Sequence, residues 1–434
     1  MPFRSCFPLL VAVLLAAGMT TYYFALLIPQ VRAVQIKRDL GEGYYFGGDF
    51  YPIWLTTCAL QLEHRNPYTD EMTRKIQTGL FGRDLSSMRP GDPPPHYRAF
   101  SYPLYADILA WPLARLSFRE VQILLGFSFS LLTTATLLLW LRGLGVPLKS
   151  SSIAAFLLLY ATSYPVLEAI FALQPTLLVA FCLAATSAAL TRGRYHIAGT
   201  CLAVGAIKPQ LTIPISVWLL FWALSAWKKR KGLPLSFAFV FLLLLATSER
   251  VLPGWFELWR AALLDYRQYT QPPLVELVLG RILGGATALL LLLLTVIRGW
   301  QARHSAPAQE DFVRTLALIL AVTILLLPTG GAVYEHVLLI PALLWLYVHR
   351  HEAAKNSTPL RWTFTLLPAA LLWQWVLACG VGIAASIRPA WRHSPQMLLL
   401  PLRLAAPLPF VVLILMGTMF LRRGLNTSTQ RVLP

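Results

Sequence analysis

Residues 121–141 read VQILLGFSFSLLTTATLLLWL, an apolar run without a charged side chain. A helix needs about 20 such residues to cross the hydrocarbon core of a bilayer. Similar runs recur along the 434-residue chain, of which 57% is hydrophobic and 13% charged. Soluble domains average about 25% charged residues. The sequence therefore predicts one all-α membrane domain over residues 1–434, a polytopic helical bundle with about twelve transmembrane spans (range about 10–13).

Polar breaks separate the candidate spans. The first run is interpreted as a retained span rather than a signal peptide, because it is long for a signal peptide's apolar region and no small-residue cleavage site with a soluble body follows it. The runs cover residues 6–28, 121–141, 152–171, 173–190, 196–208, 210–227, 232–249, 279–299, 314–328, 334–349, 362–385 and 399–420.

Basic residues cluster in alternate short connections between these runs. With the N-terminus in the cytoplasm, segments such as Arg192–Arg194 and Lys228–Lys231 become cytoplasmic, as the positive-inside rule requires. Both termini are then cytoplasmic, and we expect a multi-pass plasma (inner) membrane protein. Two long connections fall outside: residues 29–120, expected to contain interfacial helices, and residues 250–278, expected to contain an amphipathic helix around Trp255–Arg260.

Composition and motifs exclude several classes of function. The net charge of +18 is attributed to cytoplasmic loops and anionic membrane lipids rather than to nucleic acid, because no nucleic-acid-binding motif accompanies it. There is no Walker motif and no HExxH, the first outer loop has no DxD pair, and the five cysteines lack metal-binding spacing. We expect neither a metal nor a cofactor, and a lipid-linked substrate if the protein is an enzyme.

Asp49 is the first candidate catalytic residue. It lies in Gly47-Gly48-Asp49-Phe50-Tyr51-Pro52, after the first apolar run. A carboxylate held at a membrane surface among glycine, aromatic residues and proline is partly desolvated, which suits a general base. Aspartate is also common in glycine-rich turns, so a structural role stays open.

Further polar breaks border the apolar runs and contain candidate binding residues. They are Asn66 and Tyr68, Tyr102, Gln174, Lys208, and Tyr334 with Glu335 and His336. Lys208 is the most informative, because a cation between apolar runs is costly unless it is paired or faces water or a ligand, and Pro209 indicates a broken helix lining a cavity. A snorkelling Lys208 and purely structural turns at Asn66 and Tyr102 are the alternatives.

The predicted orientation places all these breaks on one face of the membrane. Randomly placed breaks would divide about equally between the two faces, so we expect a shared outer cavity. A third outer connection contains Arg388 and Arg392, which could bind phosphate or lipid head groups on the basis of charge alone.

The order of these motifs resembles the family 87 glycosyltransferases, integral membrane enzymes of the GT-C superfamily. The resemblance is carried by Gly48-Asp49-Phe50, Asn66-Pro67-Tyr68, Tyr102-Pro103, Gln174, the run from Gly193 to Pro209 and Tyr334-Glu335-His336. It extends to about residue 350. The family's usual Gly-Gln is replaced here by Leu173-Gln174.

The resemblance implies an inverting transfer of a sugar, often mannose, from a polyprenyl-phosphate-sugar donor to a lipid or glycan acceptor on the periplasmic face. The resemblance also implies that the transfer requires no metal. Asp49 would be the catalytic base, His336 a second catalytic position that orients donor phosphate or acceptor, and Lys208 would offset charge on the departing phosphate.

Two other classes of function stay open. A transporter or lipid flippase would also use broken helices and buried charges, although such proteins bind substrate near the midplane between repeats. A catalytically inactive GT-C-like scaffold is the second alternative.

Overall fold

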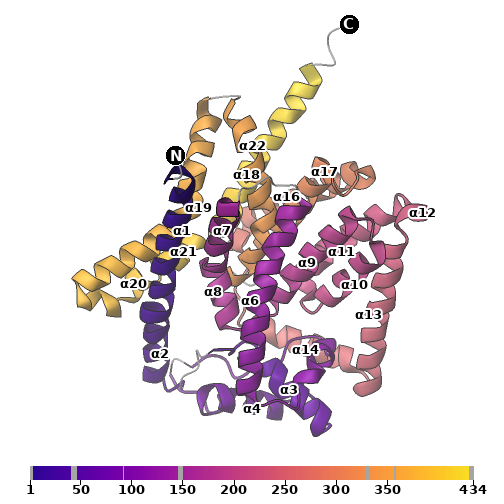
Figure 1. Cartoon of the computed structure of the whole chain (residues 1–434). Coiled ribbons are helices and arrows are strands. Elements are labelled where there is room, and N and C mark those ends of the chain that lie inside the picture. The colour runs from indigo at the N-terminus through magenta and orange to yellow at the C-terminus, as the bar shows by residue number, and fades with distance from the viewer. Residues whose placement is uncertain are drawn as a thin grey trace.

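All regular elements in the described part of the chain are helical (Figure 1). The computed structural model describes residues 3–40, 46–90, 92–144, 150–328, 332–355 and 358–429. The expectation of an all-α protein is therefore confirmed for these residues.

The helices vary widely in length. Their bounds are α1 Phe3–Thr21, η1 Tyr22–Leu27, α2 Ile28–Lys37, α3 Tyr51–Leu62, α4 Asp70–Phe81, α5 Tyr105–Ala110, η2 Trp111–Leu113, α6 Phe118–Gly143, α7 Ser150–Ala161, α8 Tyr164–Phe171, α9 Thr176–Thr191, α10 Tyr195–Gly205, α11 Pro209–Leu224, α12 Trp227–Arg230, α13 Gly232–Val251, α14 Trp255–Arg267, α15 Leu274–Leu279, α16 Arg281–Gln301, η3 Ala302–His304, α17 Glu310–Leu326, η4 Val333–Leu339, α18 Ile340–Lys355, α19 Thr358–Ile387, η5 Pro389–His393, α20 Pro395–Leu398, α21 Leu400–Ala405 and α22 Leu408–Thr429.

Several of these helices are long and apolar enough to cross a membrane. Among the described residues there are five, at Phe7–Lys37, Phe118–Gly143, Gly232–Val251, Arg281–His304 and Leu400–Met419. A sixth results if Ser151–Ala161 and Tyr164–Phe171, which are bent by 55°, form one broken span. The chain is thus an integral membrane protein.

The number of spans that length and composition support is smaller than the expected twelve. The run at 196–208 shows the reason, because it becomes α10, a helix of 11 residues. At 1.5 Å per residue such a helix measures about 16 Å, roughly half the thickness of the hydrocarbon core. An apolar run therefore does not by itself distinguish a full crossing from a helix too short to cross the membrane.

The helix α17 lies at the centre of the bundle. Every side chain from Arg314 to Leu325 is buried, as is typical of a helix that is apolar all round. In contrast, Ile282 and Leu289 on α16 are 87% and 70% exposed. Apolar surface of this kind suits contact with lipid acyl chains rather than with water.

The long connection between α2 and α6 forms helices instead of an irregular loop. Ser117 and Glu120 make a capping box at the start of α6, and Thr69 caps the start of α4. In Figure 1, α3, α4 and α14 lie together at the end of the molecule opposite the beginning of α1 and the end of α22. A helix, α14, covers the stretch around Trp255 where the sequence pattern predicts one.

Candidate functional site

The backbone around Asp49 is fixed against the end of α8. Gly47 N–H donates to the Phe171 carbonyl at 2.7 Å, and Asp49 N–H donates to the Ala172 carbonyl at 3.2 Å. Gly47 has φ +84°, and a Cβ there would lie 3.0 Å from Leu173 Cδ1. The turn thus needs glycine for both its dihedral angle and its close packing, and it sets Asp49 beside Gln174.

Both carboxylate oxygens of Asp49 are engaged. Arg98 Nη1 forms an ion pair with Oδ1, and Gln174 Nε2 donates a hydrogen bond to Oδ2. The side chain of Asp49 remains 18% exposed, and that of Arg98 28%. Asp49 is therefore a partly accessible carboxylate whose orientation is set by a cation and an amide.

Behind Gln174 lies a buried ion pair. Lys208 Nζ is 3.2 Å from Glu335 Oε1, and the two side chains are 4% and 2% exposed. The same ammonium donates to Thr176 Oγ1 at 2.8 Å and to Gln174 Oε1 at 3.4 Å. These contacts join Asp49, Gln174, Lys208 and Glu335 into one network, called the Asp49 cluster below.

The position of Lys208 follows from its sequence. Pro209 occupies the first turn of α11, where its missing N–H would have no helical partner, and Lys208 is the residue before that helix. The lysine lies 5.1 Å from the centre of the Tyr334 ring as well. The buried cation predicted from the apolar flanks is thus paired with Glu335, rather than snorkelling to the surface.

Leu173 has φ +51°, a left-handed conformation that glycine adopts without steric cost. The departure from Gly-Gln to Leu-Gln thus falls at a position whose backbone suits glycine. Leu173 is fully buried. The Leu173 side chain packs against Gly47. Leucine at this position therefore adds packing contacts, whereas the family's glycine would add only conformational freedom.

Arg98 was not found by sequence analysis. It follows three prolines, Pro93–Pro95, in a loop without periodicity, and the sequence offers no signal that this arginine rather than a neighbour meets Asp49. The structure shows how the loop is held. Gln77, 1% exposed, donates to the carbonyls of Pro95 and Tyr97 at 2.6 and 2.9 Å.

Two tyrosines interact electrostatically with the carboxylates of the cluster. Burial, with Asp49 as the next cause, raises the pKa of Tyr102 well above its usual range. Burial followed by Glu335 raises the pKa of Tyr266, a residue of α14 that sequence analysis also missed. Both hydroxyls therefore keep their protons at neutral pH and are available as hydrogen-bond donors.

The remaining predicted residues of the first outer loop support Tyr102 instead of joining the cluster. Asn66 Oδ1 accepts from Tyr68 N–H at 2.9 Å, which is the structural turn considered as the alternative reading. Tyr68 Oη donates to the Tyr102 carbonyl at 2.8 Å, and Trp259 Nε1 donates to the Ser101 carbonyl at 3.0 Å. Together they fix the backbone at Tyr102.

His336 and the two arginines of the third outer connection occupy different surroundings. His336 follows Glu335 in η4, is 3% exposed, and neither ring nitrogen has a partner among the described residues. Arg388 and Arg392 are exposed at η5. Arg388 lies 5.2 Å from the Trp391 ring, and Arg392 Nε donates to the Ala385 carbonyl at 3.1 Å. Gly330 and Gly331, which precede Tyr334 in the sequence, lie outside the described residues.

Metal-binding clusters of three or more histidine, cysteine or acidic side chains are absent from the described ranges. In the Asp49 cluster each carboxylate has a cationic partner, Arg98 for Asp49 and Lys208 for Glu335. The cluster is therefore charge-balanced by protein side chains.

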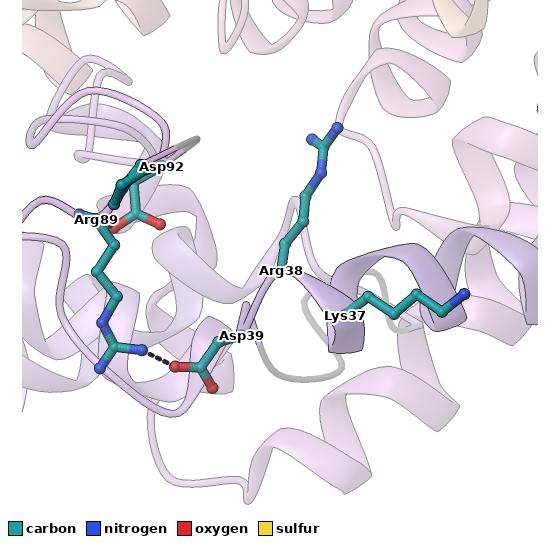
Figure 2. A pocket seen from close by; sticks show the side chains of 6 residues that line it. Lys37, Arg38, Asp39, Arg89 and Asp92 are labelled. Atoms are coloured by element: carbon teal, nitrogen blue, oxygen red, sulfur yellow. Dashed lines mark hydrogen bonds and ion pairs between the residues drawn. The ribbon is translucent and has the colours of Figure 1, made fainter.

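A cavity of about 380 Å³ lies apart from this cluster, at the C-terminal end of α2 (Figure 2). It is lined by Lys37, Arg38, Asp39, Arg89, Pro90 and Asp92. Arg89 forms an ion pair with Asp39, whereas Lys37 and Arg38 point away from that pair (Figure 2). None of the predicted site residues lines this cavity, so the Asp49 cluster is the better candidate for chemistry.

Comparison with known proteins gives one match. The family model described as glycosyltransferase family 87 matches residues 100–330. The matched part includes Tyr102, Gln174, Lys208 and Tyr266, and it begins after Asp49 and ends before Glu335. No curated protein and no solved structure matches the chain.

Proposed function

The chain belongs to glycosyltransferase family 87, and on that premise we propose a specific reaction for it. The proposed reaction is inverting transfer of a sugar, with mannose as the first candidate, from a polyprenyl-phosphate-sugar donor. The acceptor is a hydroxyl of a lipid or glycan on the extracytoplasmic (periplasmic) face of the plasma membrane. A GT-C-like arrangement of about twelve spans, with both termini cytoplasmic, is part of the proposal.

The Asp49 cluster is the observation that carries this proposal. A carboxylate that is 18% exposed is held in one orientation by Arg98 and Gln174, and the amide is held in turn by the buried Lys208–Glu335 pair. A general base requires a fixed carboxylate at the edge of a site that excludes most water. In this proposal the cluster lies at the outer membrane surface, where a prenyl chain can approach through lipid.

In the proposed step, Asp49 takes the proton of the acceptor hydroxyl. The acceptor oxygen attacks the anomeric carbon from the face opposite the phosphate, and the bond between that carbon and the phosphate oxygen breaks. The electron pair of the broken bond leaves with polyprenyl phosphate. One attack of this kind inverts the configuration at the anomeric carbon.

The other site residues have proposed supporting roles. Gln174 orients Asp49, and Lys208, whose charge Glu335 balances, holds Gln174. Tyr102 and Tyr334 bind substrate hydroxyls or the sugar face. His336 is a proposed second catalytic position, and Arg388 and Arg392 are proposed to contact lipid phosphates at the membrane surface.

The test is sugar transfer by the purified protein in lipid nanodiscs with polyprenyl-phosphate mannose and a panel of lipid acceptors. Asp49→Asn is expected to lower turnover about 10²- to 10⁴-fold, the usual contribution of general-base catalysis. Asp39→Asn is the matched control, because Asp39 is 68% exposed and lines the separate cavity. Folded Asp49→Asn protein with near-normal turnover would exclude Asp49 as the base. If wild type moves lipid across the membrane without any transfer, the flippase alternative is favoured.

A further inference from the structure

Two cations, Lys208 within the Asp49 cluster and Arg98 beside it, differ in how many hydrogen-bond donors each has left for a ligand. An ammonium has three donors, and Lys208 Nζ has three acceptors within hydrogen-bond distance: Gln174, Thr176 and Glu335. A guanidinium has five donors. Arg98 uses Nη1 for Asp49, and its Nε has no partner in the described part of the chain. Arg98 therefore has unused donors next to Asp49.

Exposure separates the same two residues. Lys208 is 4% exposed and can meet a new anion only if the buried pair with Glu335 opens. Arg98 is 28% exposed, and its partner Asp49 is 18% exposed. Because removing one partner from a buried ion pair costs more than removing one from a partly exposed pair, Arg98 is the cation that can exchange a carboxylate for an incoming anion.

Charge also points to Arg98. The side chains of Asp49, Glu335, Arg98 and Lys208 sum to zero, so a phosphate that enters beside them has to recruit a cation from an existing pair. A planar guanidinium matches two phosphate oxygens at once, which an ammonium does not.

The backbone at Arg98 is held in an unfavourable conformation. Its φ is +68°, a left-handed conformation that is unfavourable for a residue with a side chain. Gln77 binds the carbonyls before it, and the Tyr97 ring stacks on Phe81 with centroids 6.1 Å apart. Strained backbone is retained where the surrounding structure fixes it, often at ligand-binding positions. Here the fixed backbone delivers a side chain that remains able to change partner.

We propose that Arg98 binds the phosphate of the donor and alternates between two anions. In the empty protein it pairs with Asp49, and in the donor complex it pairs with the phosphate. Donor binding then frees Asp49 Oδ1 for the acceptor hydroxyl, so the base becomes available only after the donor is in place. The inference rests on the proposed function, because it assumes a phosphate-linked donor.

If Arg98 exchanges Asp49 for phosphate, Asp49→Asn should have an unusual effect on binding. An amide competes for Arg98 less strongly than a carboxylate does, so this variant should bind polyprenyl phosphate more tightly than wild type while losing transfer. Competition from one charge-assisted hydrogen bond corresponds to about 10- to 100-fold in affinity. A residue with a merely structural role would not produce tighter binding.

The experiment measures equilibrium binding of polyprenyl phosphate to the full chain in nanodiscs, with the corresponding polyprenol as the ligand that lacks phosphate. Arg98→Gln is expected to remove the preference for phosphate by about 10-fold or more while leaving polyprenol affinity unchanged, and Arg98→Lys to retain part of it. Arg89→Gln is the control, since Arg89 lies in the separate cavity and should retain wild-type binding.

The outcomes distinguish the inference from the function on which it rests. If wild type prefers phosphate and Arg98→Gln keeps that preference, or if Asp49→Asn binds more weakly, the role of Arg98 is refuted while the donor class stands. If wild type binds polyprenol and polyprenyl phosphate equally, the proposed donor class fails. If Arg98→Gln is destabilised and loses affinity for both ligands equally, and Arg98→Lys restores none of the preference for phosphate, phosphate recognition by Arg98 is refuted as well.

Discussion

Removing both members of the Lys208–Glu335 pair should destabilise the protein by less than the sum of the two single removals. The two charges are 3.2 Å apart and almost fully buried. With an effective dielectric constant of about 20, Coulomb's law gives an attraction of about 5 kcal/mol at that distance. Leaving one charge buried without its partner costs about 3–5 kcal/mol, so we expect that loss from Lys208→Met and a similar one from Glu335→Gln.

The double variant provides the sharper measurement. Lys208→Met combined with Glu335→Gln leaves no uncompensated charge, so its loss should fall at least about 2 kcal/mol short of the sum of the two single losses. Unfolding of each variant is followed by tryptophan fluorescence during SDS titration in mixed micelles. The chain has 14 tryptophans, which provide the signal.

A matched control comes from α14. Arg260 and Glu257 form an ion pair of similar chemistry, with Nε and Oε2 2.7 Å apart, but the side chains are 64% and 68% exposed. The corresponding cycle of Arg260→Met and Glu257→Gln should give a coupling of no more than about 1 kcal/mol. Strictly additive losses at Lys208 and Glu335 would refute the conclusion that the buried pair acts as one unit.

Two further substitutions test the turn at Asp49 and a buried carboxyl nearby. Gly82→Ala, at positive φ with open space around it, should lower stability by the dihedral cost alone, about 1–2 kcal/mol, and leave transfer unchanged. Gly47→Ala should lower stability by more than that, because its Cβ would also press against Leu173, and should reduce sugar transfer. Asp107→Asn should raise the SDS concentration at the midpoint of unfolding at pH 7, and this midpoint should fall less steeply as the pH rises. Asp92→Asn should lower the same midpoint at pH 7.

The opposite signs for the two aspartates follow from their surroundings. Burial raises the pKa of Asp107 well above its usual value, and its Oδ1 contacts the hydroxyls of Thr56 and Thr57. The folded state therefore binds a proton that the unfolded state has released, so stability falls as the pH rises from the unfolded pKa towards the folded one. A hydrogen bond from Arg83 lowers the pKa of Asp92, so its contribution is present above the unfolded pKa and is lost as the pH falls.

A specific outcome would contradict each of these two predictions. Equal loss of transfer in Gly47→Ala and Gly82→Ala would show that close packing at Gly47 has no special role. A lower midpoint for Asp107→Asn at pH 7 would mean that Asp107 is ionised in the folded protein.

The fold class and much of the cluster could be predicted from sequence for one reason. A polar or charged side chain beside a long apolar run is costly, so it marks a position where the fold supplies a partner, water or a ligand. Asp49, Gln174, Lys208 and Glu335 were found in this way, and the structure brings all four together. Polar residues in ordinary turns give the same signal, and Asn66 shows how such a residue can have a structural role.

The sequence by itself determined an all-helical membrane protein and the residues at the ends of its apolar runs, because desolvation acts on each side chain whatever its neighbours are. Only the tertiary structure decided which charges pair, which apolar runs become short helices, and that Arg98, Thr176 and Tyr266 interact with the Asp49 cluster. Arg98 lies in a loop without a distinctive pattern, and the patterns of the α9 and α14 segments do not single out Thr176 or Tyr266. Their meeting depends on contacts between parts of the chain far apart in sequence. A backbone angle of +68° at Arg98 is likewise set by Gln77 and the Tyr97–Phe81 stack, not by the arginine itself.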